Sequence, residues 1–433
     1  MTEEREIRID VPVMARVEGE ASLLIRTHAG RIEALKLRIF EPPRLFEKIL
    51  EGRDWFEVPD MVARICGICP VAYQMSAVQA LESLFEVDPG PWVHAQRRVM
   101  YCGEWLQSHS LHIHLLAAPD YLGFSNVIET AKQHPQVVRR GLALQALGND
   151  LVRLYGGRSV HPVGVRVGGF HRAPAMAEVG ALLVRLRAAL PEAEALLAWT
   201  AALPLPQDAQ DFTSVALRHP TDYPMNAGRL VSDRGLDIEC ADFETHFVER
   251  QEQGSTALYC YLNSQPYLVG PLARLNLNLD RLPLAVRTAL ERTGIHFPSR
   301  NMFHSIVARA VEILLALHEA IRLLADYQLP TQPYHDVSPR TGTAFGCTEA
   351  PRGLLWHRYD MQADGNVQHA RIVPPTSQNQ ARIEQDLHHS LTTFGLAHSD
   401  AELTLRGETV IRNYDPCISC ATHFLDLRRE PRP

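Results

Sequence analysis

Two C-x-x-C pairs stand near opposite ends of this 433-residue chain and limit what it can fold into. Cys66 and Cys69 lie in "ARICGICPVAYQ", and Cys417 and Cys420 lie in "NYDPCISCATH". Such pairs are typical of metal or redox sites, and four thiolates at one site select soft metals. If the two pairs meet, residues 1–433 must fold as a single cooperative domain with this site at its centre.

Other interpretations of the two pairs stay open at this point. A zinc ribbon places its pairs about 15–20 residues apart, much closer than here, although a structural zinc could still join the two ends of a large core. A dithiol redox role usually comes with a thioredoxin-like βαβ unit, which we do not find. Independent core cysteines explain the paired spacing poorly. The remaining cysteines fit no ligand pattern, and we expect small buried side chains at Cys102, Cys240, Cys260 and Cys347.

The hydrophobic periodicity predicts a predominantly helical α+β fold. A helical period marks long segments at 91–118, about 136–155, about 175–200 and 301–327, and a last helix at about 379–393. We expect the long helices to form a bundle at the core of the molecule. The cysteine pairs would then meet at the centre of this bundle.

Peripheral β structure is predicted around the bundle. Side chains alternate over residues 5–40, with a turn at "HAGR", and this pattern indicates strands. A further strand and turn are predicted in "TALYCYLNSQPYLVG", where Gly and Pro interrupt the pattern. Residues 329–378 contain many prolines, and we expect loops there.

Composition and charge argue against several classes of partner. The net charge is −7, and no dense cluster of Lys and Arg is interleaved with aromatic residues, so nucleic acid is not an expected partner. The chain has no run of about eighteen apolar residues, so no direct membrane span is predicted. Its start, "MTEEREIRIDVPV", lacks the charged-then-apolar layout of a signal peptide, which favours the cytoplasm.

The residues that flank the cysteines match one family. Arg64 and Gly67 accompany the first pair, and Asp415, Pro416 and His423 accompany the second, giving R-x-C-G-x-C and D-P-C-x-x-C-x-x-H. With these motifs the chain resembles the large, catalytic subunit of NiFe hydrogenases from about residue 12 to residue 423. The resemblance implies the NiFe-hydrogenase large-subunit fold and the reversible, heterolytic oxidation of H2 to protons and electrons.

The resemblance also implies the ligands of a nickel–iron centre. Cys66 and Cys417 would be terminal ligands of nickel. Cys69 and Cys420 would bridge nickel to an iron that also carries carbon monoxide and cyanide. The segment "IVPPTSQN" would supply Thr376 as a donor to a cyanide nitrogen.

Three further motifs imply groups that handle protons and charge. "ARVEGEASLLI" would supply Glu18 as the acceptor for a proton first taken by Cys417 or Arg352; a solvated strand glutamate is the alternative. "CTEAPRGLLWH" would place Arg352 over the open face of the metals, because a guanidinium stays charged and donates well. "LHIHLLAAPDYLG" would supply Asp120 to orient Arg352 through a charge-assisted hydrogen bond. The alternative for this last pair is a structural ion pair.

A second, hard cation such as Mg²⁺ is implied near the same site. Glu47 in "FEKILEGRDW" would bind it through a carboxylate oxygen, together with the backbone carbonyl of Ile372 and with His423; a helix-surface glutamate is the alternative. In the family, a maturation endopeptidase removes the tail after this histidine. We therefore expect residues 424–433 to be absent from active enzyme.

Several other polar residues stand near these motifs in the sequence. His112 and His161 match family positions, and we expect both to be buried structural groups. His109 and His114 are expected to be ordinary polar positions. Many relatives have histidine where this chain has Tyr73; a hydroxyl can still donate a hydrogen bond, so we expect tuning of the centre.

The electrons released from H2 need carriers outside this chain, because no further cysteine set for an iron–sulfur cluster is present. A small subunit with iron–sulfur clusters is therefore implied. The compact length and "NYDPCISCATHFLDL" look most like the cytoplasmic, pyridine-nucleotide-linked (group 3) branch, typically a heterotetramer with flavin and further iron–sulfur subunits that acts on NAD or NADP. A metal-free relative of the quinone-reductase type and a zinc-stabilised scaffold protein are the alternative functions.

Overall fold

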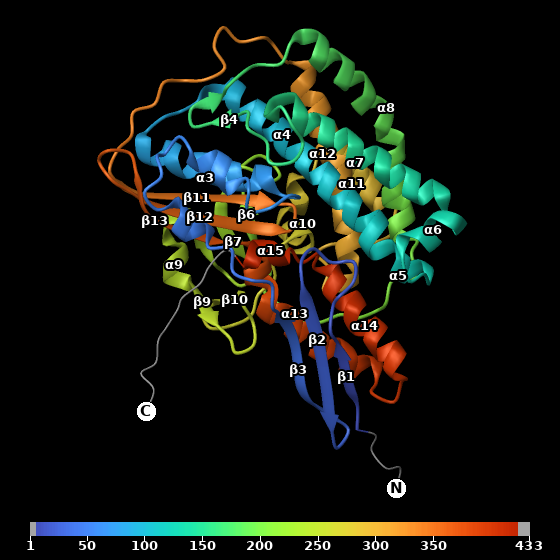
Figure 1. Cartoon of the computed structure of the whole chain (residues 1–433). Helices are drawn as coiled ribbons and strands as arrows, with labels where there is room; N and C mark the ends of the chain where they lie inside the picture. Colours follow the sequence, from blue (N-terminus) through green and yellow to red (C-terminus); the bar gives the residue numbers. More distant parts are fainter. Residues whose placement is uncertain (1–5, 423–433) are drawn as a thin grey trace, which may run out of the picture.

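Long helices gather on one side of the computed structural model and small antiparallel sheets on the other (Figure 1); the structure describes residues 6–422. The bundle consists of α4 (Gly90–Leu111), α7 (Pro135–Gly156), α8 (Met176–Ala201) and α12 (Ser305–Ala325). Helix α4 packs against α7 and α12, and α12 also packs against α8. The predicted α+β architecture with a helical core is confirmed.

The contact between α4 and α7 depends on two glycines that face each other. A Cβ atom on Gly148 would lie 2.5 Å from the carbonyl oxygen of Gly103 and 2.6 Å from the backbone nitrogen of Gln107. Both distances are far inside van der Waals contact. The two helices can therefore approach this closely only because both positions lack a side chain.

Helix α12 is buried on nearly all sides, as its apolar sequence predicts. Every residue from Ser305 to Leu317 is buried, including the charged side chains of Arg309 and Glu312. A buried charge is costly unless it is paired and hydrogen-bonded. These positions therefore need partners from neighbouring elements.

The remaining helices link the bundle to the sheets or cover sheet faces. Helix α3 (Pro70–Phe85) packs against β11 and β12, and α13 (Pro375–Phe394) packs against β3, β10 and α14 (Asp400–Asn413). A π-helical turn, His112–Ala117, continues α4 into α5. The shorter helices are α1 (Phe46–Leu50), α2 (Val58–Val62), α5 (Ala118–Leu122), α6 (Val127–Gln133), α9 (Phe243–His246), α10 (Pro271–Asn278), α11 (Leu284–Glu291) and α15 (Ile418–Ala421), with 3₁₀ turns at Cys240–Asp242, Leu279–Arg281 and Met302–His304.

The N-terminal strands form a meander of β1 (Arg8–Val11), β2 (Ala21–His28) and β3 (Arg31–Ile39). The β2–β3 hairpin turns at Ala29 and Gly30, both with positive φ (48° and 68°), which matches the right-handed twist of the flanking strands. This is the turn predicted at "HAGR". The buried side chains of the sheet pack on α13 and α14.

A second meander, β11 (Gly342–Ala350), β12 (Gly353–Met361) and β13 (Val367–Val373), lies within the segment predicted to be loops. That prediction is wrong for 342–373. In β12 and the second half of β11, burial on both faces hides the alternation of side chains that marks a half-buried strand. The prolines stand outside the strands, at Pro330, Pro333, Pro339, Pro351, Pro374 and Pro375.

Three two- or three-stranded sheets complete the fold. They are β4–β5 (Val165–Arg166, Gly169–Phe170), β6–β7–β8 (Val215–Arg218, Arg229–Ser232, Asp237–Ile238) and β9–β10 (Phe247–Gln251, Leu258–Leu262). One apolar core runs through the bundle and the N-terminal sheet, and a smaller one lies among β6, β10, β11 and β12. Within residues 6–422, no helix combines the length and the hydrophobicity that a membrane crossing requires.

Candidate metal centre

The structure brings the two cysteine pairs together. The Sγ atoms of Cys66, Cys69, Cys417 and Cys420 all lie within 4.8 Å of one another, and all four side chains are buried. Across the pairs, Cys66 and Cys417 are 3.5 Å apart and Cys69 and Cys420 are 3.7 Å apart. Four buried sulfur donors at these distances form a suitable site for soft metals.

The first pair lies in the turn that leads into α3. The backbone N–H groups of Ile68 and Cys69 donate to the Cys66 sulfur at 3.3 and 3.2 Å. Although burial opposes it, hydrogen bonds from the other three cysteines lower the pKa of the Cys66 thiol well below its usual range. A thiolate is the form that binds metal, and these contacts favour it at Cys66, whereas burial raises the pKa of the other three thiols.

Glu104 of α4 fixes the start of α3 directly behind the first pair. Its fully buried carboxylate accepts the N–H groups of Val71 and Ala72 at 2.6 and 3.0 Å. These are orphan donors of the first helical turn, and Cys69 provides no side-chain cap. Sequence reasoning missed Glu104, since a glutamate in the middle of a helix gives no signal of where it points.

The second pair begins α15 and is held by α13 and by the N-terminal segment. The N–H of Cys417 donates to the Thr376 hydroxyl at 2.9 Å, which leaves the hydroxyl's own hydrogen free to donate elsewhere. Cys417 also pairs with Glu18 in a parallel β-bridge, and the N–H of Ile418 donates to the Glu18 carbonyl at 3.1 Å. Residues from both ends of the chain therefore form one wall of the site.

The Glu18 carboxylate binds Ser419, which stands between the two cysteines of the second pair. It accepts the Ser419 N–H at 3.1 Å and the Ser419 hydroxyl at 2.5 Å. The same hydroxyl lies 3.2 Å from the Glu41 carboxylate. Glu18, Ser419 and Glu41 thus form a continuous polar path that begins beside Cys417.

Arg352 reaches the site from the turn between β11 and β12. Its buried guanidinium donates from Nε to the Asp415 carbonyl at 2.7 Å and from Nη2 to the Asp415 carboxylate at 3.1 Å. Although burial alone would lower it, the charges of Asp415 and of the cysteines raise the pKa of Arg352 well above its usual value. Arg352 therefore remains a cation beside the four sulfurs.

The predicted pairing of Asp120 with Arg352 is wrong. Asp120 lies in α5 and binds Nη1 of Arg412 with both carboxylate oxygens at 2.9 Å, and it also pairs with Arg16. Asp415, two residues before Cys417, takes the predicted place beside Arg352. Asp415 belongs to the D-P-C-x-x-C-x-x-H motif, but the motif alone does not show that this residue contacts Arg352.

Two buried hydrogen-bond donors near the sulfur site also indicate that it can hold a metal centre with ligands of its own. Arg352 Nη1 and the Tyr73 hydroxyl have no hydrogen-bond partner among residues 6–422. Burial, followed by the charges of the four cysteines, raises the pKa of Tyr73 well above its usual value, so its hydroxyl faces the sulfur cluster as a neutral donor. Unpaired buried donors are costly, and ligands of a metal centre would satisfy both.

The predicted hard-cation site is only partly within the described residues. Glu47 of α1 lies beside Ile372 and accepts that residue's N–H at 2.6 Å, whereas the Ile372 carbonyl is the group predicted to bind the ion. The Thr422 carbonyl accepts the Arg44 N–H at 2.6 Å, so the chain passes close to the start of α1 just before His423. His423 itself and the tail 424–433 lie outside the described residues.

The structure agrees with the predictions for some of the histidines and contradicts others. His112 is buried, as expected, and donates from Nε2 to the Arg412 carbonyl at 2.6 Å; His161 is only half-buried and bonds the Ala63 carbonyl at 2.7 Å. His109 and His114 are not ordinary polar positions: both are fully buried, and burial lowers the pKa of each to about 4.

The other four cysteines lie away from the cluster. Cys102, Cys260 and Cys347 are buried, as expected, while Cys240 is half-buried. None of the four joins the group of sulfur atoms that could hold a metal among residues 6–422.

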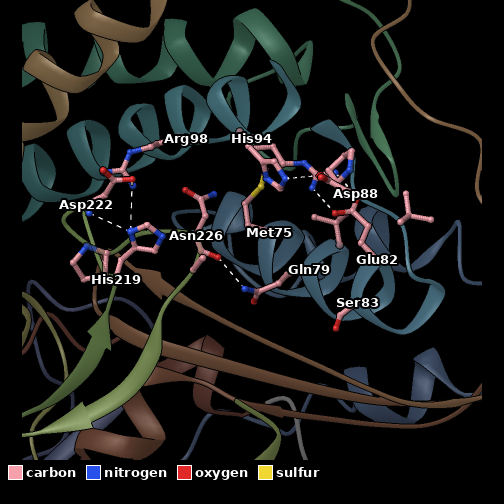
Figure 2. Close-up of a pocket in the computed structure, with 16 residues that line it drawn as sticks. Met75, Gln79, Glu82, Ser83, Asp88, His94, Arg98, His219, Asp222 and Asn226 are labelled. Carbon is pink, nitrogen blue, oxygen red and sulfur yellow. Dashed lines mark hydrogen bonds and ion pairs between the residues drawn. The ribbon is translucent and has the colours of Figure 1, made fainter. Parts of the chain in front are cut away.

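The metal centre does not open into the cavity between α3, α4 and the loop 219–227. This cavity has a volume of about 520 Å³ and is lined by Met75 and Gln79 on one side and His219 on another (Figure 2). None of the four cysteines lines it. The buried sulfur site therefore stands apart from this cavity.

Comparison with known proteins identifies the class that this fold and site define. A family model described as nickel-dependent hydrogenase matches residues 44–141 and 255–423. The sulfhydrogenase 2 subunit alpha of Pyrococcus furiosus is 30% identical over 97% of this chain and 100% of its own length. The NAD-reducing hydrogenase HoxS subunit beta of Cupriavidus necator is 28% identical over 97% of this chain and 95% of its own length.

A solved structure of an NAD⁺-reducing [NiFe]-hydrogenase in the H2-reduced state matches with a TM-score of 0.86 and 28% identity, covering 96% of this chain and 99% of the other. The chain belongs to the nickel-dependent hydrogenase family. It is a catalytic large subunit, an oxidoreductase acting on H2, and the four cysteines form its site for a nickel–iron centre.

Proposed function

We propose that this chain is the H2-activating subunit of a cytoplasmic, pyridine-nucleotide-linked hydrogenase. The single observation that carries the activity is the cluster of four buried cysteine sulfurs within 4.8 Å of one another. The pyridine-nucleotide link is supported by the NAD-reducing relative and by the similar NAD⁺-reducing structure. Both matches cover nearly the whole chain.

Each cysteine has a distinct part in the proposed centre. Cys66 and Cys417 would hold nickel, and Cys69 and Cys420 would be shared between nickel and an iron that also carries carbon monoxide and cyanide. The free Nη1 of Arg352 and the Thr376 hydroxyl are the donors available to cyanide nitrogens. When bound, the centre supplies the heterolytic cleavage of H2, and the overall reaction yields two protons and two electrons.

The proton leaves through groups that the chain itself provides. Cys417 is the more suitable first acceptor, because Asp415 and the cysteine charges keep Arg352 protonated. Glu18 then takes the proton and passes it through the Ser419 hydroxyl to Glu41, along contacts of 2.5 and 3.2 Å. Asp120 has no step in this route, since it binds Arg412 of α14 and Asp415 binds Arg352.

A Mg²⁺ or similar ion binds next to the centre in this proposal. Glu47 is its carboxylate ligand, and the Ile372 carbonyl and His423 complete the protein ligands. The proximity of Glu47 to Ile372, and of Thr422 to Arg44, supports this arrangement. A maturation endopeptidase removes residues 424–433 after metal insertion, so His423 becomes the new C-terminus.

Partner subunits carry the electrons away. A small subunit with iron–sulfur clusters receives them, and flavin and further iron–sulfur subunits pass them to NAD or NADP. The described residues contain only one cluster of cysteines that could hold a metal, which supports external carriers.

Purification of the native complex, followed by an assay of H2-driven reduction of NAD⁺ and of NADP⁺, tests this proposal. We expect copurified flavin and iron–sulfur subunits and reduction of at least one of the two nucleotides. Hydrogen uptake with artificial dyes but with neither nucleotide would contradict the proposed link while leaving the H2 chemistry intact.

A further inference from the structure

We propose that Arg274 of α10 is a positioning residue for Arg352: it fixes the turn of the β11–β12 hairpin and thereby keeps the Arg352 guanidinium beside the four sulfurs. This inference rests on the proposed place of Arg352 at the metal centre. Arg274 has no role in the reaction as described above, and its side chain is fully buried.

All five N–H donors of the Arg274 guanidinium have an acceptor. Nε and Nη2 donate to the two carboxylate oxygens of Glu312, each at 2.7 Å. Nη1 donates to the Glu349 carboxylate at 2.7 Å and to the Ala350 carbonyl at 2.9 Å. Nη2 also donates to the Pro351 carbonyl at 3.2 Å. A guanidinium has five such hydrogens, so this environment uses its full donor capacity.

Three of these five acceptors belong to the residues directly before Arg352. Strand β11 ends at Ala350 and β12 begins at Gly353, which leaves a two-residue turn of Pro351 and Arg352. A shift of this turn would move Arg352 away from Asp415 and from the sulfurs. By binding the carbonyls of Ala350 and Pro351, Arg274 fixes the backbone from which the Arg352 side chain extends.

The groups that Arg274 binds are themselves held by neighbouring elements. Glu349 also accepts the Leu217 N–H at 2.6 Å, and its carbonyl accepts the Trp105 indole N–H at 3.1 Å. Glu312 also bonds His109 and Tyr223, each at 2.8 Å. The Arg274 guanidinium lies 4.2 Å from the centre of the Trp105 ring, a favourable cation–π contact.

Burial makes this network rigid. Arg274, Glu312 and Glu349 have no exposed side-chain surface, so no water can replace a lost contact. Although burial opposes it, Arg274 holds the pKa of Glu312 at about 2, and the pair therefore stays charged. Removing one partner of such a pair leaves an uncompensated charge in the core. A substitution at Arg274 must therefore keep its positive charge, whereas a neutral residue at position 349 still leaves Arg274 paired with Glu312.

Arg274→Lys keeps the charge but removes the planar donor fork, since an ammonium has three donors and acts as a point charge. Arg97→Lys is the matched control. Arg97 is also buried and binds Glu82 with two nitrogens, at 2.7 and 2.6 Å, and the Arg166 carbonyl at 3.1 Å. None of these contacts reaches the hairpin turn.

The experiment compares the native complex carrying Arg274→Lys, Arg97→Lys, Arg352→Lys and the Arg274→Lys/Arg352→Lys double variant. The readouts are nickel content, the infrared bands of the diatomic ligands, and H/D exchange per nickel. In Arg274→Lys we expect shifted cyanide bands and exchange reduced about 10- to 100-fold, the size of effect that a displacement of about 1 Å produces. Arg97→Lys should keep the wild-type infrared bands, and its H/D exchange per nickel should stay within about twofold of wild type.

The double variant decides whether Arg274 acts through Arg352. If it does, the double variant loses no more exchange than Arg352→Lys alone, because the group being positioned is already gone. Unshifted bands in Arg274→Lys, or losses that multiply in the double variant, would overturn the inference. Wild-type exchange and bands in Arg352→Lys would instead overturn the proposed function of Arg352.

A variant with a milder change covers the case in which Arg274→Lys does not yield folded protein. Glu349→Gln keeps the shape of the side chain but removes the charge that faces Arg274. It should shift the cyanide bands in the same direction, with a smaller loss of exchange. Unchanged bands in folded Glu349→Gln would overturn the inference in that case.

Discussion

Single residues around the sulfur cluster carry the chemistry, and their contacts separate proton transfer from metal binding. Glu18 contacts the second cysteine pair through Ser419 and through its own backbone, but its carboxylate is not among the sulfur donors. Cys417 belongs to the sulfur cluster and also adjoins Glu18 through the β-bridge. Substitutions at the two positions should therefore have different spectroscopic consequences.

Glu18→Gln should block proton transfer and leave the metals in place, since glutamine keeps the shape but cannot carry the proton. We expect H/D exchange to fall about 10²- to 10⁴-fold, the range typical of a lost acid–base group, with the infrared bands retained. Glu20→Gln is the control, because Glu20 is exposed in the same segment. Unchanged exchange in Glu18→Gln would mean that protons leave by another route.

Cys417→Ser should abolish H2 uptake, because a neutral hydroxyl replaces a soft thiolate ligand and proton acceptor. Cys240→Ser, at a half-buried cysteine outside the cluster, should retain activity. The measurement is H2 uptake per folded protein. Wild-type uptake in Cys417→Ser would be incompatible with the assigned ligand set.

At the scale of secondary-structure elements, contacts at the start of α3 fix the first cysteine pair, and contacts at the β11–β12 turn fix Arg352. Glu104 of α4 binds the first N–H groups of α3, and a residue of one element thereby orients the start of another. Arg274 of α10 acts in the same way on the β11–β12 turn. In both cases a buried polar side chain binds backbone groups next to a site residue.

Glu104→Ala should destabilise the protein by about 1–3 kcal/mol for each of the two buried N–H groups that lose their acceptor. Glu104→Gln keeps one carbonyl oxygen and should lose less. Thermal unfolding of the two variants, with nickel content as a second readout, tests this difference. Equal melting temperatures for Glu104→Ala and wild type would show that α3 begins stably without this cap.

The elements also show which parts of the fold the sequence predicts and which it does not. The 3.6-residue period of α12 and the turn at Ala29–Gly30 are local signals, and both predictions agree with the structure. Strand β12 and the second half of β11 give no strand signal, because burial on both faces removes the alternation on which a strand prediction depends. Motif spacing identified the cysteines, but the partner of Arg352 depends on long-range packing, which favours Asp415 over Asp120.

At the scale of the whole molecule, the two ends of the chain meet at the metal centre. Glu18 pairs with Cys417, and the Thr422 carbonyl binds the Arg44 N–H. The C-terminal segment therefore docks against structure formed by the first 70 residues. We propose that metal is inserted before this docking and that residues 424–433 are removed afterwards.

The active enzyme should end at His423. The tail "FLDLRREPRP" carries several charges, and burying it beside the centre would be costly. Intact-mass measurement of the nickel-loaded, active fraction should give the mass of residues up to 423. A full-length mass in that fraction would show that cleavage is not required in this protein.

The central claim is that the four clustered cysteines hold a nickel–iron centre. Infrared spectroscopy of the purified native complex, together with metal analysis, tests it most directly. The account predicts stoichiometric nickel, and bands of carbon monoxide and cyanide that disappear in Cys417→Ser. Zinc in place of nickel, or the absence of these bands from active enzyme, would contradict it.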